Sequence, residues 1–355
     1  MAAPAVNRPA TADAPASAAA GRAAARSGPR REAVLLVAAG LGIVVLAAAS
    51  MFIGVSDVSL PAMLAGHQDT WDIFWISRVP RTLAVILAGT AVAVAGLIMQ
   101  LMARNRFVEP STVGTVESAT LGILVVTVLA PAAPLMAKMG VAGGFALAGT
   151  ALFLAVLRRL PARSTLLVPL TGIMLGGVTG SVTTFFAYRF DLLQTLNNWM
   201  IGDFSGVLRG RYELLWIVAA LTVAGYIAAD RFTVAGMGAD FTTNLGMNYK
   251  ATMRLGLVLV ALISAIVVTT VGAVPFLGLV VPNLVSLLFG DNLRRAVPWT
   301  AVFGAGFVLV CDILGRTIRY PYEVPVGMVM SVAGAAVFLL LLLRGRPKRK
   351  GAGRG

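Results

Sequence analysis

The stretch Asp230-Arg-Phe-Thr-Val-Ala-Gly-Met-Gly-Ala-Asp-Phe-Thr-Thr-Asn-Leu-Gly-Met-Asn-Tyr-Lys250 interrupts a chain that is otherwise strongly apolar. It is about twenty residues of mixed polarity, and three glycines break it into short pieces: Gly236, Gly238 and Gly246. A turn between two membrane helices needs only a handful of residues. The sequence therefore predicts a short helix over 239–245, in a loop long enough for another protein to grip.

The composition of the whole chain indicates a polytopic membrane protein. Of its 355 residues, 58% are hydrophobic and 12% are charged, and the mean hydropathy is +0.86. Soluble domains carry about 25% charged residues. The net charge of +14 would suggest nucleic-acid binding in a soluble protein. Here the basic residues lie at the termini and in short loops, where they orient a protein in a membrane.

Ten apolar segments follow one another, each near the ~20 residues that a bilayer requires. They lie at 33–53, 79–102, 113–134, 139–157, 165–188, 212–229, 254–272, 275–290, 298–315 and 325–343. The sequence therefore predicts an all-α membrane protein with ten transmembrane helices over 32–343. Residues 1–31 are predicted to be a disordered tail, with a transit peptide as the alternative, and 344–355 a basic tail.

The distribution of Lys and Arg predicts the orientation of these spans. Ten spans place both termini on one side of the membrane. With the termini in the cytoplasm, 21 Lys and Arg lie inside and eight outside; without the two tails the count is ten against eight. The positive-inside rule then predicts cytoplasmic termini, a cytoplasmic 231–250 loop and a location in the cell membrane.

The residue sets that catalysis requires are missing from this sequence. It has no Gly-x-x-x-x-Gly-Lys-Ser/Thr phosphate loop, and His67 and Cys311 are its only histidine and cysteine. With one histidine we identify no Ser/His/Asp set, and with one cysteine no cysteine-based metal site can form within one chain. We therefore expect a transport subunit rather than an enzyme, with no metal or cofactor bound by this chain.

Small residues form a stripe in the fifth predicted span. Gly172, Gly176 and Gly180 recur every four residues, and Gly177 lies beside them. Such a stripe allows close helix packing, or it leaves room for a translocation path. Both interpretations stay open. The following segment is predicted to form a short outer helix near 194–201, either a gate or a simple surface loop.

Three ionisable residues fall inside predicted spans. Asp312 and Arg316 are four residues apart and are predicted to form an ion pair. Glu117 lies in the third span and has no evident partner in the sequence. Intramembrane acids are functional candidates by default, although Glu117 lies near a membrane edge.

Five ordered motifs connect the chain to a known family. They are Arg78-Val-Pro-Arg81, Gln100 with Ala103-Arg-Asn-Arg-Phe-Val-Glu-Pro110, Trp199-Met-Ile-Gly202, Gly272-Ala-Val-Pro-Phe-Leu-Gly-Leu-Val-Val-Pro-Asn283 and Glu323-Val-Pro-Val-Gly327. Together they resemble the FecCD-type permeases of iron–siderophore and cobalamin ATP-binding cassette importers. The resemblance covers about 79–343.

This resemblance implies two permease subunits around a central path, two cytoplasmic ATPases that bind ATP and Mg, and an outer binding protein. It assigns the 231–250 loop to ATPase coupling, with the family's Ala-x-x-Leu-Gly replaced here by Thr242-Thr-Asn-Leu-Gly246. The coupling residues expected on this basis are Ala239, Asp240, Thr242, Asn244, Leu245 and Gly246. The outer arginines expected to meet glutamates of the binding protein are Arg78, Arg81 and Arg316.

The implied function is ATP-driven import of a ferric siderophore. Pro275, Asn283 and Glu117 depart from the common family pattern and resemble the branch that imports catecholate or mixed siderophores. Import of haem or cobalamin by the same architecture is the alternative. A secondary transporter driven by an ion gradient is the rival class, and it should carry paired ionisable residues at the midplane of several spans. The second permease subunit can be a copy or a paralogue.

Overall fold

The computed structural model describes residues 29–54, 63, 65, 68–112, 114–157, 159, 167–210, 212–290 and 292–344. Within these residues the chain is helical and contains no strand. Residues 1–28 and 345–355 of the two predicted tails, and the lone histidine His67, lie outside the described residues.

Each of the ten predicted apolar segments coincides with a helix. The long helices are α2 (Pro29–Phe52), α5 (Val79–Ala103), α7 (Leu135–Leu157), α8 (Leu167–Arg189), α13 (Tyr249–Val271), α15 (Leu293–Thr317) and α16 (Val326–Arg344). Three are shorter: α6 (Thr115–Leu129), α10 (Leu215–Ile227) and α14 (Leu277–Phe289). Connecting helices include α4 (Gln68–Ile73), α9 (Leu193–Met200), α11 (Ala229–Met237) and α12 (Ala239–Asn244). The predicted outer helix near 194–201 is confirmed as α9.

Not all of the ten helices have the length of a membrane crossing. Among the described residues, seven helices are long and apolar enough to cross a bilayer, and α10 with α11 forms an eighth that is bent by 57°. Helices α6 and α14 are apolar but shorter, at 15 and 13 residues. The all-α membrane fold is confirmed, while the count of ten stays a prediction.

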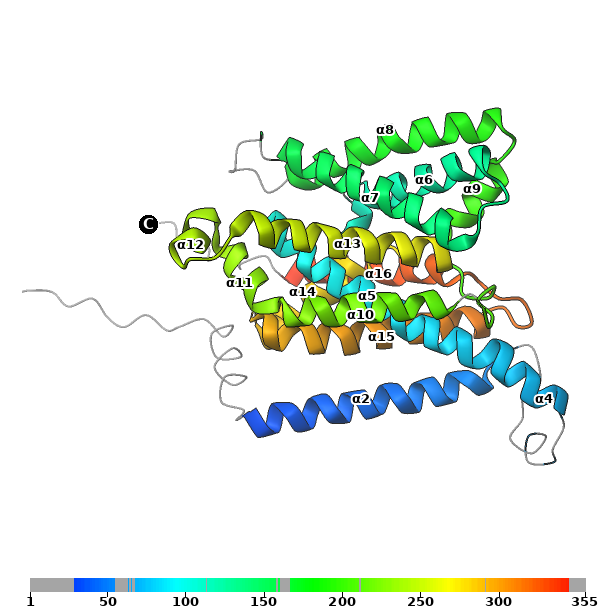
Figure 1. The fold of residues 1–355 in the computed structure, drawn as a ribbon. Helices are drawn as coiled ribbons and strands as arrows, with labels where there is room; N and C mark the ends of the chain where they lie inside the picture. The colour runs from blue at the N-terminus through cyan, green and yellow to red at the C-terminus, as the bar shows by residue number, and fades with distance from the viewer. Residues whose placement is uncertain are drawn as a thin grey trace, which may run out of the picture.

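Helix α5 lies at the centre of the bundle. It packs against α10, α13, α14 and α15, and many of its buried positions are alanine or glycine, which lets neighbouring backbones approach closely. Helices α2 and α8 lie at opposite edges of the bundle (Figure 1). Helix α2 contacts mainly α15, and α8 contacts mainly α6 and α7.

We name the two ends of the bundle the α12 end and the α9 end, after the short helices that they carry (Figure 1). At the α12 end, Arg294 of α15 pairs with Asp230 of α11 at 3.2 Å, and Arg295 faces Glu32 of α2 at 3.8 Å. The starts of α2 and α15 therefore lie together with α11 at this end.

Three of the family motifs meet at the α9 end through their backbones. The Gly327 N–H donates to the Gly202 carbonyl at 2.8 Å, and the Asp203 N–H donates to the Val271 carbonyl at 2.9 Å. A Cβ at Gly202 would collide with the Ala273 carbonyl oxygen. Close backbone contact explains why glycine is needed at these positions.

We expect Gly202→Ala to destabilise the protein, because the added methyl group has no room at this contact. Overpacking of this kind costs about 1–3 kcal/mol. Gly206→Ala is the matched control, since nothing lies within 4 Å of a Cβ built there. The melting temperature of the detergent-purified chain measures both, and equal values for the two variants would contradict the packing argument.

Candidate functional site

The loop 231–250 folds into α11 and α12, joined at Gly238. The predicted helix over 239–245 is confirmed as α12 (Ala239–Asn244). Gly238 has a φ of 132°, which residues with a side chain rarely adopt, and a Cβ there would lie 3.1 Å from Nη2 of Arg104. Arg104 follows the last residue of α5. Its guanidinium group therefore packs the end of the central helix against the joint between α11 and α12.

Thr242 is the buried residue of α12 rather than part of its outer surface. Its hydroxyl donates to the Val234 carbonyl at 3.1 Å and to the Gly238 carbonyl at 2.5 Å. The side chain thus fastens α12 back onto α11. Thr242 stands where the family motif has alanine, and its additional hydroxyl group forms hydrogen bonds within the loop.

An apolar strip covers the outer surface of this loop. Met237, Phe241 and Leu245 are 61%, 48% and 57% exposed: Met237 ends α11, and Phe241 and Leu245 lie four residues apart in α12 and at its C-terminal end. We name these three residues the coupling face. Met237 and Phe241 were not predicted as coupling residues; Phe241 lies in the predicted helix four residues before Leu245, whereas Met237 lies before the break at Gly238. The other predicted coupling residues, Ala239, Asp240, Asn244 and Gly246, are also exposed.

At the α9 end, a buried network of charges joins α5 to α15. Arg81 donates from Nε and Nη2 to Oδ1 of Asp312, at 3.1 and 2.9 Å, and from Nη1 to Oε2 of Glu323 at 2.7 Å. Arg316 bonds Oδ2 of the same aspartate, so the predicted Asp312–Arg316 ion pair is confirmed. Asp312 is completely buried, and both of its oxygens accept from arginine.

Arginines of the same network cap the C-terminal end of α2. Arg316 donates from Nη1 to the carbonyls of Ser50 and Ile53, at 2.9 and 2.6 Å, and Arg78 donates to the Ile53 carbonyl at 3.0 Å. Carbonyls at a helix C-terminus lack partners within the helix and attract cations. These arginines therefore hold α2, which has few other contacts, against the bundle.

Arg78, Arg81 and Arg316 are all buried in this chain and bonded within it. Their docking with a binding protein stays a prediction, and the structure gives each guanidinium group a role in holding helices together. Arg81 and Asp312 are 231 residues apart in the sequence. No local sequence pattern therefore indicates the hydrogen bonds between them.

The glycine stripe of α8 faces α6, where it meets Glu117. Gly172 and Gly176 are buried and Gly177 is exposed. A Cβ at Gly176 would lie 3.4 Å from the Glu117 carboxyl carbon, and one at Gly180 would lie 3.9 Å from its Cγ. Oε2 of Glu117 is buried, with no hydrogen-bond partner among the described residues. The stripe therefore packs against this acid, while the other face of α8 is left exposed.

Glu109 has a role that the sequence analysis did not assign. Its buried carboxylate accepts from the Phe276 N–H at 3.2 Å and from the Ser111 hydroxyl at 2.5 Å. Phe276 directly precedes α14, where unpaired backbone N–H groups favour a negative charge. Glu109 therefore ties the turn after α5 to the start of α14.

Comparison with known proteins decides the family. Residues 40–344 match the model of the FecCD transport family. The chain belongs to this family. It is 45% identical over 302 residues, 85% of this chain and 96% of the relative, to the petrobactin import system permease protein YclN of Bacillus subtilis (strain 168).

Two further comparisons agree with this assignment. The ferric-anguibactin transport system permease protein FatD of Vibrio anguillarum is 40% identical over 305 residues, 86% of this chain and 97% of the relative. In structure, the FecCD chain resembles a metal-chelate type ABC transporter in an inward-facing conformation. The TM-score is 0.76, with 21% identity, over 87% of this chain and 99% of that chain. The fold is thus that of an ABC importer permease.

We expect Asp312→Ala to destabilise the FecCD chain by about 3–5 kcal/mol, because it leaves two buried arginines without their shared anion. Asp230→Ala is the control: it removes an exposed aspartate–arginine pair, which is worth about 0–1 kcal/mol. Thermal unfolding of both variants in detergent measures the difference. Equal melting temperatures would show that the buried network contributes little.

Proposed function

We propose that this chain is the permease subunit of an ATP-binding cassette importer that carries a ferric siderophore across the cytoplasmic membrane. Its membership of the FecCD transport family carries this conclusion. The relatives at 40–45% identity are permeases of petrobactin and anguibactin import systems, and they support a ferric siderophore as the cargo. The chain spans nearly their whole length.

The coupling face is proposed to dock on a cytoplasmic ATPase. Met237, Phe241 and Leu245 expose large apolar surface at the tip of a polar loop, where lipid does not cover it. Exposed apolar patches with polar rims mark protein contacts. ATP and Mg would be bound by that partner, because this chain has no phosphate loop. Arg104, packed on Gly238, links movement of the loop to the central helix α5.

The α12 end is proposed to face the cytoplasm together with both termini, which places the arginine network on the outer side. An outer binding protein would meet that side, where Arg78, Arg81 and Arg316 lie close to the surface segment of Glu323.

A second permease subunit, a copy or a paralogue, is proposed to pack along α8. The exposed face of α8 carries large apolar side chains, and the path would then run beside Gly177.

The cargo assignment is tested by iron uptake. Cells that express this chain with its partner subunits should accumulate radioactive iron from a ferric catecholate or mixed siderophore, and cells without the chain should not. Excess cobalamin or haem should not compete. Uptake that survives ATP depletion and stops when the ion gradient collapses would instead identify a secondary transporter.

Introducing one negative charge into the coupling face tests whether it docks on the ATPase. Phe241→Asp should weaken co-purification of the ATPase about thirtyfold, as expected for a central apolar contact worth about 2 kcal/mol. Uptake should fall with it. Thr243→Asp, which adds the same charge at an exposed polar position of α12, is the matched control. If both variants retain the ATPase, the coupling face lies elsewhere.

A further inference from the structure

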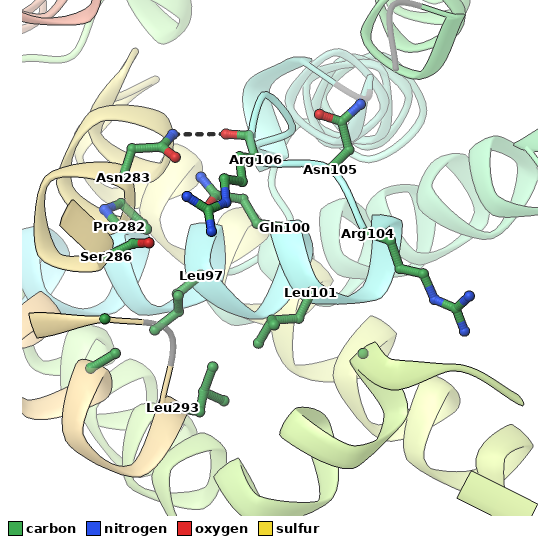
Figure 2. Close-up of a pocket in the computed structure, with 13 residues that line it drawn as sticks. Leu97, Gln100, Leu101, Arg104, Asn105, Arg106, Pro282, Asn283, Ser286 and Leu293 are labelled. Carbon is green, nitrogen blue, oxygen red and sulfur yellow. Dashed lines mark hydrogen bonds between the residues drawn. The ribbon is translucent and has the colours of Figure 1, made fainter. Parts of the chain in front are cut away.

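Two cavities at the α12 end differ in whether their polar side chains already have partners. The first, of about 310 Å³, lies between the end of α5, α14 and the start of α15. Its Asn283 side chain donates to the Arg106 carbonyl at 2.7 Å (Figure 2). Arg106 and Ser286 have further partners within the chain. The polar groups of this cavity thus serve the packing of the permease itself.

The second cavity is a groove between the end of α7 and the start of α13, which we name the α7–α13 groove. Its volume is about 240 Å³, below the range of about 300–1,000 Å³ for pockets that enclose a whole small ligand. It can therefore hold only part of a larger molecule. Apolar and cationic surface lie side by side in it: its floor is formed by Ala151, Leu154, Ala155 and Leu257, and its cations are Lys250 and Arg254.

The two cations of the groove have no partner among the described residues. Both side chains are exposed, and neither forms a hydrogen bond or an ion pair with another described residue. The sequence around them is also free of acids: no aspartate or glutamate occurs in 118–190, which contains α7, or in 241–290, which contains α13. Three further cations follow α7 directly, at Arg158, Arg159 and Arg163. This surplus of positive charge attracts anions.

Lys250 and Arg254 project from an ordered turn at the edge of the membrane. The Asn248 side chain accepts from the Ala251 N–H at 3.0 Å and so caps α13. Lys250 and Arg254 are four residues apart and therefore share one helical face. Helix α13 has 23 residues, about 34 Å of rise, which exceeds the hydrocarbon core of about 30 Å. Its first turn thus lies at the level of the lipid headgroups, where lysine and arginine keep their charged ends in the polar layer.

We propose that the α7–α13 groove binds an anionic phospholipid, with Lys250 and Arg254 at its headgroup phosphate and an acyl chain along the apolar floor. Basic pockets between membrane helices bind lipid headgroups in this way. The assignment to the cytoplasmic leaflet rests on the proposed orientation of the permease, whereas binding itself does not. Lys250 also ends the loop 231–250. A bound headgroup would hold this end of the loop at the membrane surface, so lipid composition would influence coupling to the ATPase.

Lipid binding by the detergent-purified full chain tests this site. Native mass spectrometry compares the apparent affinity for phosphatidylglycerol with that for phosphatidylcholine, which has no net charge. Lys250→Gln and Arg254→Gln should each lower the affinity for phosphatidylglycerol about fivefold, and the double variant about thirtyfold, because each cation contributes a separate attraction. The affinity for phosphatidylcholine should not change.

Matched controls separate this site from unspecific effects. Arg231→Gln removes an exposed cation of α11 outside the groove and should leave the affinity unchanged. Ala155→Phe fills the groove with both cations intact and should lower the affinity. Ala137→Phe places the same side chain near the start of α7 and should not. All of these positions are exposed, so each variant should keep the melting temperature of the unmodified chain.

The outcomes are distinct. A preference for phosphatidylglycerol that is lost in the double variant and kept in Arg231→Gln supports the proposal. Equal affinity of the unmodified chain for both lipids overturns it, and so does a double variant that binds phosphatidylglycerol as the unmodified chain does. If that double variant loses only co-purification of the ATPase, the two cations belong to a protein contact; the lipid site is then rejected, while the proposed permease function stands.

Discussion

The carboxylate of Asp312 is buried between two guanidinium groups, and its charge is stable only while both remain in place. This requirement fixes four segments that are far apart in the sequence. Arg81 belongs to α5, Arg316 to α15, Glu323 to the segment before α16, and the carbonyls of Ser50 and Ile53 to the end of α2. The same central helix ends beside Arg104, which packs on the coupling loop. Helix α5 has 25 residues, about 37 Å of rise, so one continuous helix connects the α9 end to the α12 end.

Most of the fold could be predicted from the sequence because each helix is an apolar run bounded by polar or glycine-rich breaks. The short helices α9 and α12 were also predictable, since local polarity and breakers mark them. The number of membrane crossings was not predictable, because α6 and α14 are too short for their length alone to show whether they cross the bilayer. Contacts such as Gly202 with Gly327 were beyond prediction as well. They depend on tertiary packing, and the sequence indicates only that glycines occur within the motifs.

The candidate site was predicted in outline and corrected in detail. The short helix within 231–250 was predicted from its polarity and glycine breaks, and five of the six residues predicted for coupling are exposed. Thr242 is turned inward, because a threonine hydroxyl can satisfy carbonyls of the preceding helix. The spacing of Phe241 and Leu245 in the predicted helix could have indicated two residues of the coupling face, whereas Met237 lies beyond the break at Gly238. Only the Asp312–Arg316 pair could be predicted locally; the burial of Arg78, Arg81 and Arg316 was not evident, because most of their partners come from distant segments.

The short helix α14 has a consequence for how the protein enters the membrane. Its 13 residues extend about 20 Å, whereas the hydrocarbon core is about 30 Å thick. The N–H of Phe276, at its start, is satisfied by Glu109, a residue made more than 160 positions earlier during synthesis. Helix α14 is thus too short to cross the hydrocarbon core by itself, and the N–H at its start depends on a side chain from outside the helix. Its place in the bundle is therefore prepared by α5 and the following turn, which are synthesised before it.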